Sequence, residues 1–312
     1  MNYTLHQLRV FLKVCEHMSI TKAAHELHLS QPAVSIQLKN FQDQFILPLT
    51  EVIGKRIFIT EFGHEIAVAA KNIIREVEEI NYKTQAFKGL LTGKVKISVV
   101  STGQYVLPYF ISDFFSTHPG LDLFLDTTNK SKVLAALREN QTDFALMSVV
   151  PLDLDVHHID LLPNHLFLVC NKKIWDTHDN NIVAIFKQHP FLLREEGSAT
   201  RSESEKYLTK AGTAITKKIE LSSNETVKQA VLAGMGISIL PLIGMKNQLL
   251  DGSLQIIPIS GLPLETTWRL VWLKEKALSP AARTFIKYIE EQKENIVKMH
   301  FDWIKEYIGL HF

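Results

Sequence analysis

The hydrophobic pattern of the first 41 residues predicts three short helices. Apolar residues recur at helical spacing in three segments, namely at Leu5, Leu8, Phe11, Leu12 and Val14, at Ala23, Ala24 and Leu27, and at Val34, Leu38 and Phe41. Ser30 stands where an N-cap is expected, and Pro32 lies in the first turn of the third segment, where its missing N–H costs little. Residues 20–41 therefore predict two helices joined by a tight turn, with a supporting helix before them.

The third helix presents a small, polar face. Its members are Gln31, Pro32, Ser35, Ile36 and Lys39. A Gln side chain can pair bidentately with adenine, Ser can donate or accept, and apolar atoms can contact a thymine methyl group. The arrangement is typical of a helix-turn-helix, which docks its second helix in the DNA major groove. An ordinary three-helix corner with a solvated face is the alternative.

A small hairpin is predicted next, over residues 52–60. The segment VIGKRIFIT turns around Gly54 and carries Lys55 and Arg56 at or beside its tip. A basic hairpin in this place suits a wing that reaches the minor groove or the DNA backbone. A solvated turn is the alternative.

Residues 62 to about 91 then follow a heptad spacing. The stripe consists of Ile66, Ala70, Ile73, Val77, Ile80, Thr84, Phe87 and Leu91, and only Thr84 interrupts its apolar character. A stripe sustained over more than three heptads predicts a helix that pairs with a second copy of the chain. Packing against its own chain is the alternative. Gly89 and Gly93 mark a domain boundary.

From Lys94 onward, predicted strands alternate with predicted helices. Strand segments such as KVKISVV, LDLFLDT, DFALMSVV, HLFLVCNK, PFLLR and TWRLVWLK are separated by helical segments such as KSKVLAALREN and ETVKQAVLAG. This pattern predicts an α/β fold of parallel-type units. We expect a DNA-binding domain over 1–61, a linker helix over 62–92 and an effector domain over 93–294. Its two lobes would be 93–161 with 266–294, and 162–265; a further amphipathic helix is predicted over 295–312.

Charge and composition exclude few classes of function. The 312 residues are 46% hydrophobic and 21% charged, which is ordinary for a globular protein, and the formal net charge is +1. DNA binding would therefore depend on a few placed cations, on helix N-termini and on pairing of two chains. No signal segment or membrane-spanning run is evident, so a cytoplasmic protein is expected.

No pattern indicates catalysis, a metal or a cofactor. His157 and His158 are adjacent, so their side chains diverge in a strand, and no nucleophile elbow or Gly-rich phosphate loop is present. Cys15 and Cys170 lie far apart in apolar runs, without metal or disulfide spacing. The sequence therefore predicts a protein that is not an enzyme.

Together these motifs resemble those of the LysR-type transcriptional regulators. TLHQLRVF, ITKAAHELHLSQPAVSIQL and GKRIFIT before a long helix match the N-terminal part, and STGQY, LREEGSATR and SNETVKQAVLAGMGISILP match the effector domain. The residues of these motifs are similar to those of the branch that regulates ribulose-bisphosphate carboxylase and other carbon-fixation operons. The resemblance implies a winged helix-turn-helix, a long dimerisation helix and a two-lobed, periplasmic-binding-protein-like effector domain.

The resemblance also implies a small anionic metabolite bound between the two lobes. Ser101 and Thr102 follow a strand and open a helix, so their hydroxyls and backbone N–H groups can hold a carboxylate or phosphate. Arg201 can clamp an anion bidentately, and Asn224 serves either as a helix cap or as a ligand contact. The full predicted effector set is Ser101, Thr102, Gln104, Ser148, Ser198, Thr200, Arg201 and Asn224.

Further partners follow from the same resemblance. It implies a homodimer, a homotetramer built as a dimer of dimers, an interrupted inverted repeat in promoter DNA, and RNA polymerase as a partner during activation. A regulator that is ligand-independent or gated by a protein is the alternative, and a secreted solute-binding protein is a weaker one. Two departures are Thr50, where the family usually has an aromatic residue, and Glu195 with Glu196, where carbon-fixation regulators commonly show Pro.

Overall fold

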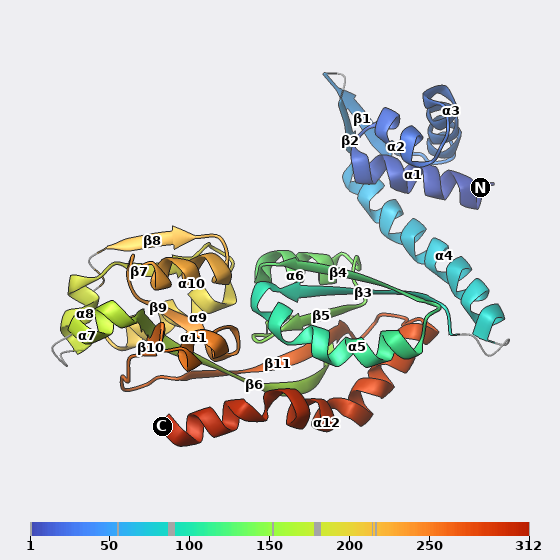
Figure 1. The fold of residues 1–312 in the computed structure, drawn as a ribbon. Helices are drawn as coiled ribbons and strands as arrows, with labels where there is room; N and C mark the ends of the chain where they lie inside the picture. Colours follow the sequence, from blue (N-terminus) through green and yellow to red (C-terminus); the bar gives the residue numbers. More distant parts are fainter. Residues whose placement is uncertain are drawn as a thin grey trace. The chain divides into compact units, whose positions relative to one another are not determined.

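The computed structural model describes residues 2–54, 56–86, 91–151, 153–177, 182–213, 215 and 217–311 (Figure 1). The chain divides into two compact units, Met1–Leu90 and Leu91–Phe312. The boundary lies close to Gly89 and Gly93, where the heptad pattern gives way to alternating strand and helix patterns.

The described residues of the first unit form four helices and one hairpin. They are α1 (Leu5–His17), α2 (Ile20–Glu26), α3 (Gln31–Gln42), β1 (Thr50–Ile53), β2 (Arg56–Ile59) and α4 (Glu61–Ala86). The side chains of Thr4, Ser19 and Ser30 cap the first three helices by accepting hydrogen bonds from backbone N–H groups. Phe11, Val34 and other apolar residues from the predicted stripes are fully buried in a common core. The three predicted helices are therefore confirmed, and so are their inward faces except at Leu5, which is 42% exposed.

The hairpin forms where the sequence predicts it. β1 and β2 pair antiparallel, and Gly54 between them has a φ of +57°, a conformation that glycine adopts without a Cβ penalty. The Gln42 side chain accepts hydrogen bonds from Thr50 N and Oγ1 at 2.9 and 2.7 Å. A polar link thus connects α3 to the hairpin at Thr50. Lys55 lies outside the described residues.

The first residues of the apolar stripe on the long helix α4 pack within its own unit. Ala70 is 1% exposed and belongs to the core, with Ile66 packed against that core, whereas Ile73 is 38% exposed. Packing against the same chain, the alternative interpretation, therefore accounts for the first two stripe positions. Phe87 lies outside the described residues.

The second unit is built on a mixed sheet. Its strands are β3 (Gly93–Val100), β4 (Leu121–Thr128), β5 (Phe144–Met147), β6 (Val156–Asn171), β9 (Ser238–Pro241), β10 (Leu254–Ile256) and β11 (Leu264–Leu273), in the order β10-β6-β11-β5-β3-β4 with β9 also paired to β6. A smaller sheet pairs β7 (Phe191–Arg194) with β8 (Lys218–Leu221) in parallel. The intervening helices are η1 (Ser101–Tyr105), α5 (Leu107–Thr117), α6 (Lys130–Arg138), α7 (Lys172–Thr177), α8 (Ile182–Gln188), α9 (Ala199–Lys210), α10 (Asn224–Leu232), η2 (Leu242–Gly244) and α11 (Lys246–Leu250).

The expectation of parallel-type units is only partly correct. β3 pairs in parallel with β4 and β5, but β11 pairs antiparallel with both β5 and β6. β6 runs for 16 residues, of which only the second half was predicted as a strand. β6 and β11 are long because they pass from one half of the unit to the other, which an alternating βα pattern does not reveal.

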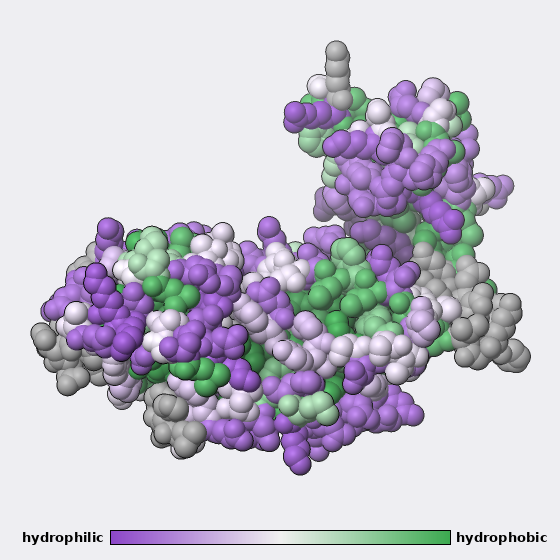
Figure 2. All heavy atoms as spheres, in the orientation of Figure 1, coloured by the Kyte–Doolittle hydropathy of each residue, from purple (hydrophilic) through white to green (hydrophobic). Residues whose placement is uncertain are grey.

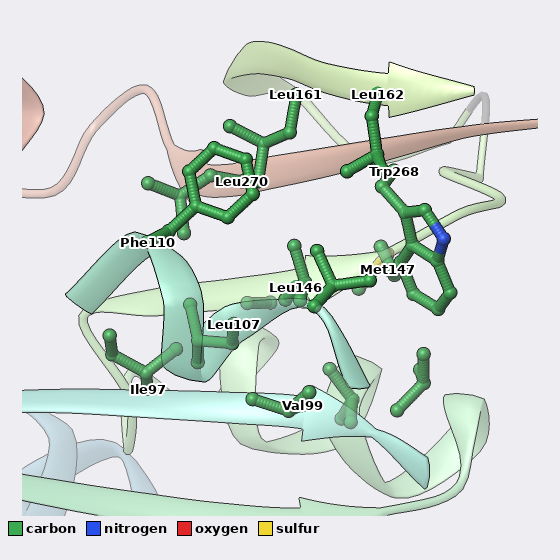
Figure 3. Packing of buried hydrophobic residues seen from close by; sticks show 14 of the residues in the cluster. Ile97, Val99, Leu107, Phe110, Leu146, Met147, Leu161, Leu162, Trp268 and Leu270 are labelled. Carbon is green, nitrogen blue, oxygen red and sulfur yellow. The ribbon is translucent and has the colours of Figure 1, made fainter. Parts of the chain in front are cut away.

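We call the half with β3 to β5, α5 and α6 lobe I, and the half with β7 to β10 and α7 to α11 lobe II. The crossing strands β6 and β11 connect them. Figure 3 shows their apolar side chains converging on α5 and β5 in lobe I, with Leu161, Leu162, Trp268 and Leu270 facing Leu107, Phe110, Leu146 and Met147. One core therefore fixes the crossing strands to lobe I.

The C-terminal helix does not begin at residue 295. It is the second half of α12 (Pro280–His311), a single helix of 32 residues. Phe301 stacks on Phe110 of α5 with ring centroids 6.0 Å apart, and Trp303 lies under the Lys246 ammonium of α11 at 4.9 Å. The predicted extra helix is thus a continuation that packs against both lobes.

The surface of the described residues is largely polar. Figure 2 shows hydrophilic residues over much of the viewed face, with smaller hydrophobic patches between them. Among the described helices, none is long and apolar enough to cross a membrane.

Candidate DNA-binding face and effector site

The predicted recognition face of α3 is accessible in the first unit. Gln31, Pro32, Ile36 and Lys39 are exposed, and Ser35 is half-buried. The opposite face of the helix is fixed by Val34 and Phe41, which are completely buried. The N-terminal end of α3, capped by Ser30, therefore presents side chains outward.

The hairpin adds exposed apolar residues that the sequence analysis did not assign to a site. Val52, Ile53 and Phe58 are 71%, 60% and 45% exposed, and Arg56 between them is also exposed. These apolar residues could have been recognised in the sequence, because a turn that only faces solvent rarely has so many apolar neighbours. The combination of a cation and apolar side chains suits contact with a groove edge better than a solvated turn does.

One trio near α1 has the composition of a metal site. The ligand atoms of Glu16, His17 and Glu26 lie within 4.8 Å of one another. The Lys13 ammonium, however, pairs with Glu16 at 2.7 Å and also with Glu26. The trio is therefore an ion-pair network that ties α1 to α2.

In the second unit, Ser101 joins the two lobes. Its Oγ accepts a hydrogen bond from Arg194 Nη1 at 2.9 Å and another from Asn224 Nδ2 at 3.2 Å. Ser101 follows β3 in lobe I, whereas Arg194 ends β7 and Asn224 begins α10 in lobe II. The Arg194 side chain is only 3% exposed. A buried guanidinium and an amide thus meet a hydroxyl at the lobe boundary.

Asn224 is not the cap of its helix. Ser223 caps α10 by accepting from Thr226 N, which leaves the Asn224 side chain to reach Ser101. Asn224 is 5% exposed, and its Oδ1 has no hydrogen-bond partner among the described residues. A buried acceptor without a partner costs about 1–3 kcal/mol, so this atom favours a ligand that carries a donor.

The other predicted effector residues fall into two groups. Thr102, Ser148, Ser198 and Thr200 are buried, at 5–8% exposure, whereas Gln104 is exposed. The Ser198 hydroxyl caps α9 by accepting from Arg201 N. Most of the predicted hydroxyl groups therefore lie inside the second unit, whereas the Gln104 amide lies at its surface.

Arg201, the predicted anion clamp, is paired with carboxylates. Its guanidinium donates to Glu205 at 3.0 Å, to Glu220 at 2.6 Å and to the Arg194 carbonyl at 3.1 Å. The nearby cation that faces Ser101 is Arg194, which sequence reasoning missed. Arg194 immediately follows three buried apolar residues of β7, and this position at a strand end was the available signal.

A second polar link crosses the lobe boundary. Tyr105 in η1 donates a hydrogen bond to Glu225 of α10 at 2.7 Å, and Lys228 pairs with the same carboxylate at 2.9 Å. Burial opposes ionisation of Glu225, but hydrogen bonds from Lys228, Tyr105 and Gln229 outweigh it and lower the pKa of Glu225 to about 2. Glu225 is therefore charged across the physiological range.

Replacement of Glu225 by Gln is expected to change the acid limb of the stability curve. The folded pKa of Glu225 is depressed from its ordinary 4.5 to about 2, so its contribution is present above pH 4.5 and is lost as the pH falls towards 2. Urea unfolding of E225Q should therefore give a shallower loss of stability in that window than the wild type. The same change at exposed Glu290 serves as the control, and an equal effect in both variants would contradict the assignment.

The loop after β7 also contacts lobe I. Ser131 N donates to Gly197 O at 3.3 Å, and a Cβ on Gly197 would lie 2.5 Å from Ser131 Oγ. Gly197 has a φ of +82°, so both its conformation and its surroundings require glycine. This close approach brings Glu195 and Glu196 to the start of α6.

A cavity of about 990 Å³ opens beside this loop, between α6 and α9. Its lining includes four cations and two carboxylates, namely Lys130, Arg201, Lys206 and Lys210 with Glu196 and Glu205. Its size is sufficient for a small metabolite. The lobe boundary is therefore open to solvent between α6 and α9, through a cavity lined by polar residues.

Two family models account for almost the whole chain. The lysR family model of bacterial regulatory helix-turn-helix proteins matches residues 5–64, and the LysR substrate-binding-domain model matches residues 88–294. The chain belongs to the LysR family. It is a DNA-binding transcriptional regulator with an effector-binding domain, and members of this family are regulators rather than enzymes.

Individual LysR-type relatives are similar over nearly their full length. The transcriptional activator CmpR of Synechocystis is 32% identical and is matched over 95% of this chain and 97% of its own. The RuBisCO operon transcriptional regulator of Allochromatium vinosum is 35% identical, over 93% and 96%. The regulatory domain of Synechocystis CcmR, solved in complex with 2-PG, is 27% identical and covers 65% of this chain and 99% of its own with a TM-score of 0.60.

Proposed function

We propose that this LysR-type regulator is controlled by a small anionic metabolite bound between lobes I and II. The observation that carries the proposal is the buried contact of Arg194 and Asn224 with Ser101 across the lobe boundary. The Arg194 guanidinium is 3% exposed and directs its Nη1 group to Ser101, and a buried site strengthens its attraction for an anion. The effector binds there with Thr102, Ser148, Ser198 and Thr200 as further contacts.

The expected ligand carries a carboxylate or phosphate together with a hydrogen-bond donor. The anion faces Arg194, and the donor satisfies Asn224 Oδ1, which lacks a partner among the described residues. The 2-PG complex of the related CcmR domain supports a small anionic effector. The similarity to RuBisCO operon regulators supports carbon-fixation genes as targets.

The regulatory step follows from linkage. A ligand that binds the closed lobes more tightly than the open lobes shifts the population towards closure. The crossing strands β6 and β11, with a register shift between Trp268 and Arg269, are the elements that a change in lobe angle must bend. In a pair of chains, a changed lobe angle alters the spacing of the two helix-turn-helix domains on DNA.

On the DNA side, α3 enters the major groove through Gln31, Pro32, Ser35, Ile36 and Lys39. Arg56, with Lys55, contacts the minor groove or the backbone beside it. Two chains read an interrupted inverted repeat in promoter DNA, and two dimers form a tetramer. The exposed face of α3 and the exposed Arg56 support this arrangement.

Dimer formation through α4 gives a direct prediction. I73D is expected to shift the purified protein from dimer to monomer, because it places a charge in the proposed heptad seam beyond the residues that serve the unit's own core. V68D is the matched control, since Val68 lies on α4 outside the stripe and is 56% exposed. Sedimentation velocity measures the change, and an unchanged dimer in I73D would place the interface elsewhere.

The effector assignment is tested by isothermal titration of the full-length protein with 2-phosphoglycolate, inorganic phosphate, sugar phosphates and simple carboxylates. Saturable binding that is competed by a second anion supports the proposal. No binding by any of them contradicts the anionic effector and favours a regulator that is constitutive or gated by a protein. Such a result would leave DNA binding by the family unaffected.

A further inference from the structure

The Glu195 carboxylate lies at the lobe boundary and is paired with Arg194. Arg194 donates two hydrogen bonds of 2.8 Å to it, from Nε to Oε2 and from Nη2 to Oε1. From lobe I, the Asn129 side chain contributes to lowering the pKa of Glu195. Asn129 Oδ1 accepts from Lys132 N at 3.0 Å as the cap of α6. The carboxylate at the end of β7 thus lies near the start of α6.

These surroundings are those of a bound anion. A bidentate guanidinium on one side and a helix N-terminus on the other form a favourable carboxylate environment, and α6 has nine residues to supply the dipole. Arg194 is 3% exposed and Glu195 is 21% exposed, so solvent screens the pair weakly. The protein therefore fills this position with its own carboxylate.

We propose that Glu195 is an internal counter-ion that competes with the anionic effector for Arg194. The inference rests on the proposed function, because it requires an anion at Arg194. An effector that takes the Nε and Nη2 donors must displace the Glu195 carboxylate, and one that binds the remaining donors meets its repulsion. In either case Glu195 weakens binding of the anion.

The charge state of Glu195 agrees with this role. Burial opposes its ionisation, but the hydrogen bonds and charge of Arg194 outweigh burial and lower the pKa of Glu195. The carboxylate is thus a charged competitor at neutral pH. Its neighbour Glu196 has a side chain that is 90% exposed and lies 3.9 Å from Arg201, outside the contact with Arg194.

The test is isothermal titration of full-length wild type, E195Q and E196Q with 2-phosphoglycolate and with inorganic phosphate. The amide in E195Q keeps the shape and one acceptor for Arg194 but removes the charge. We expect E195Q to bind the anion at least about tenfold more tightly than wild type, given the usual coupling between close charges. E196Q, on the same loop, should bind as wild type does.

The outcomes separate the inference from the proposed function. Equal affinities of E195Q and wild type, with binding lost in R194K, would overturn the competition and leave the anion site in place. If no anion binds wild type or E195Q, the proposed function fails together with the inference. Should E195Q unfold, E195D keeps the charge but withdraws it by one methylene, and an affinity below that of wild type would overturn the proposal.

Discussion

Replacing Gln31 with alanine is expected to weaken binding of the full-length protein to its operator by about 5- to 150-fold. Gln31 is exposed at the N-terminal end of α3, where a recognition helix contacts base edges. Loss of one bidentate base contact costs about 1–3 kcal/mol, which corresponds to that range. Fluorescence anisotropy with a DNA fragment enriched by the protein from a random pool provides the measurement.

Two further variants distinguish base reading from general attraction to DNA. K39A should weaken binding to operator and unrelated DNA alike and reduce the salt dependence by about one phosphate contact. N40A is the matched control, because Asn40 is exposed on the last turn of the same helix. Equal losses in Q31A and N40A would show that the α3 face is not read as proposed.

Replacing Arg194 with lysine is expected to reduce affinity for the anionic effector by roughly 30-fold or more, as for other truncated buried charge contacts. Lysine keeps the charge but loses the planar fork that contacts both Glu195 and Ser101. Arg201→Lys is the control, because Arg201 is occupied by Glu205 and Glu220. Titration calorimetry of both variants measures the effect, and a larger loss in the Arg201 variant would restore that residue as the clamp.

The first unit could be predicted in detail because its signals are local. The helix cap at Ser30, the turn at Gly54 and the buried faces of three short helices are all properties of neighbouring residues. The alternation of strands and helices in the second unit could also be predicted from neighbouring residues. The long strands β6 and β11 could not, since their pairing joins residues about 100 positions apart, such as Asn164 and Thr266.

The effector site shows the same limit. Ser101 and Asn224 were predicted because each stands at the start of a helix, where polar groups are available. Arg194 and Arg201 are seven residues apart and equally cationic. Only the folded chain reveals that Arg201 pairs with Glu205 and Glu220, while Arg194 pairs with Glu195 and also contacts Ser101.

The measurement that tests the whole account most directly is DNase I footprinting of the full-length protein on its enriched operator, with and without a saturating anion that binds in titration. The account predicts a protected interrupted inverted repeat whose extent or bend-induced hypersensitivity changes with the anion, and a loss of that change in R194K. The same footprint at every anion concentration, in a protein that binds the anion, would contradict coupling between the lobes and the DNA.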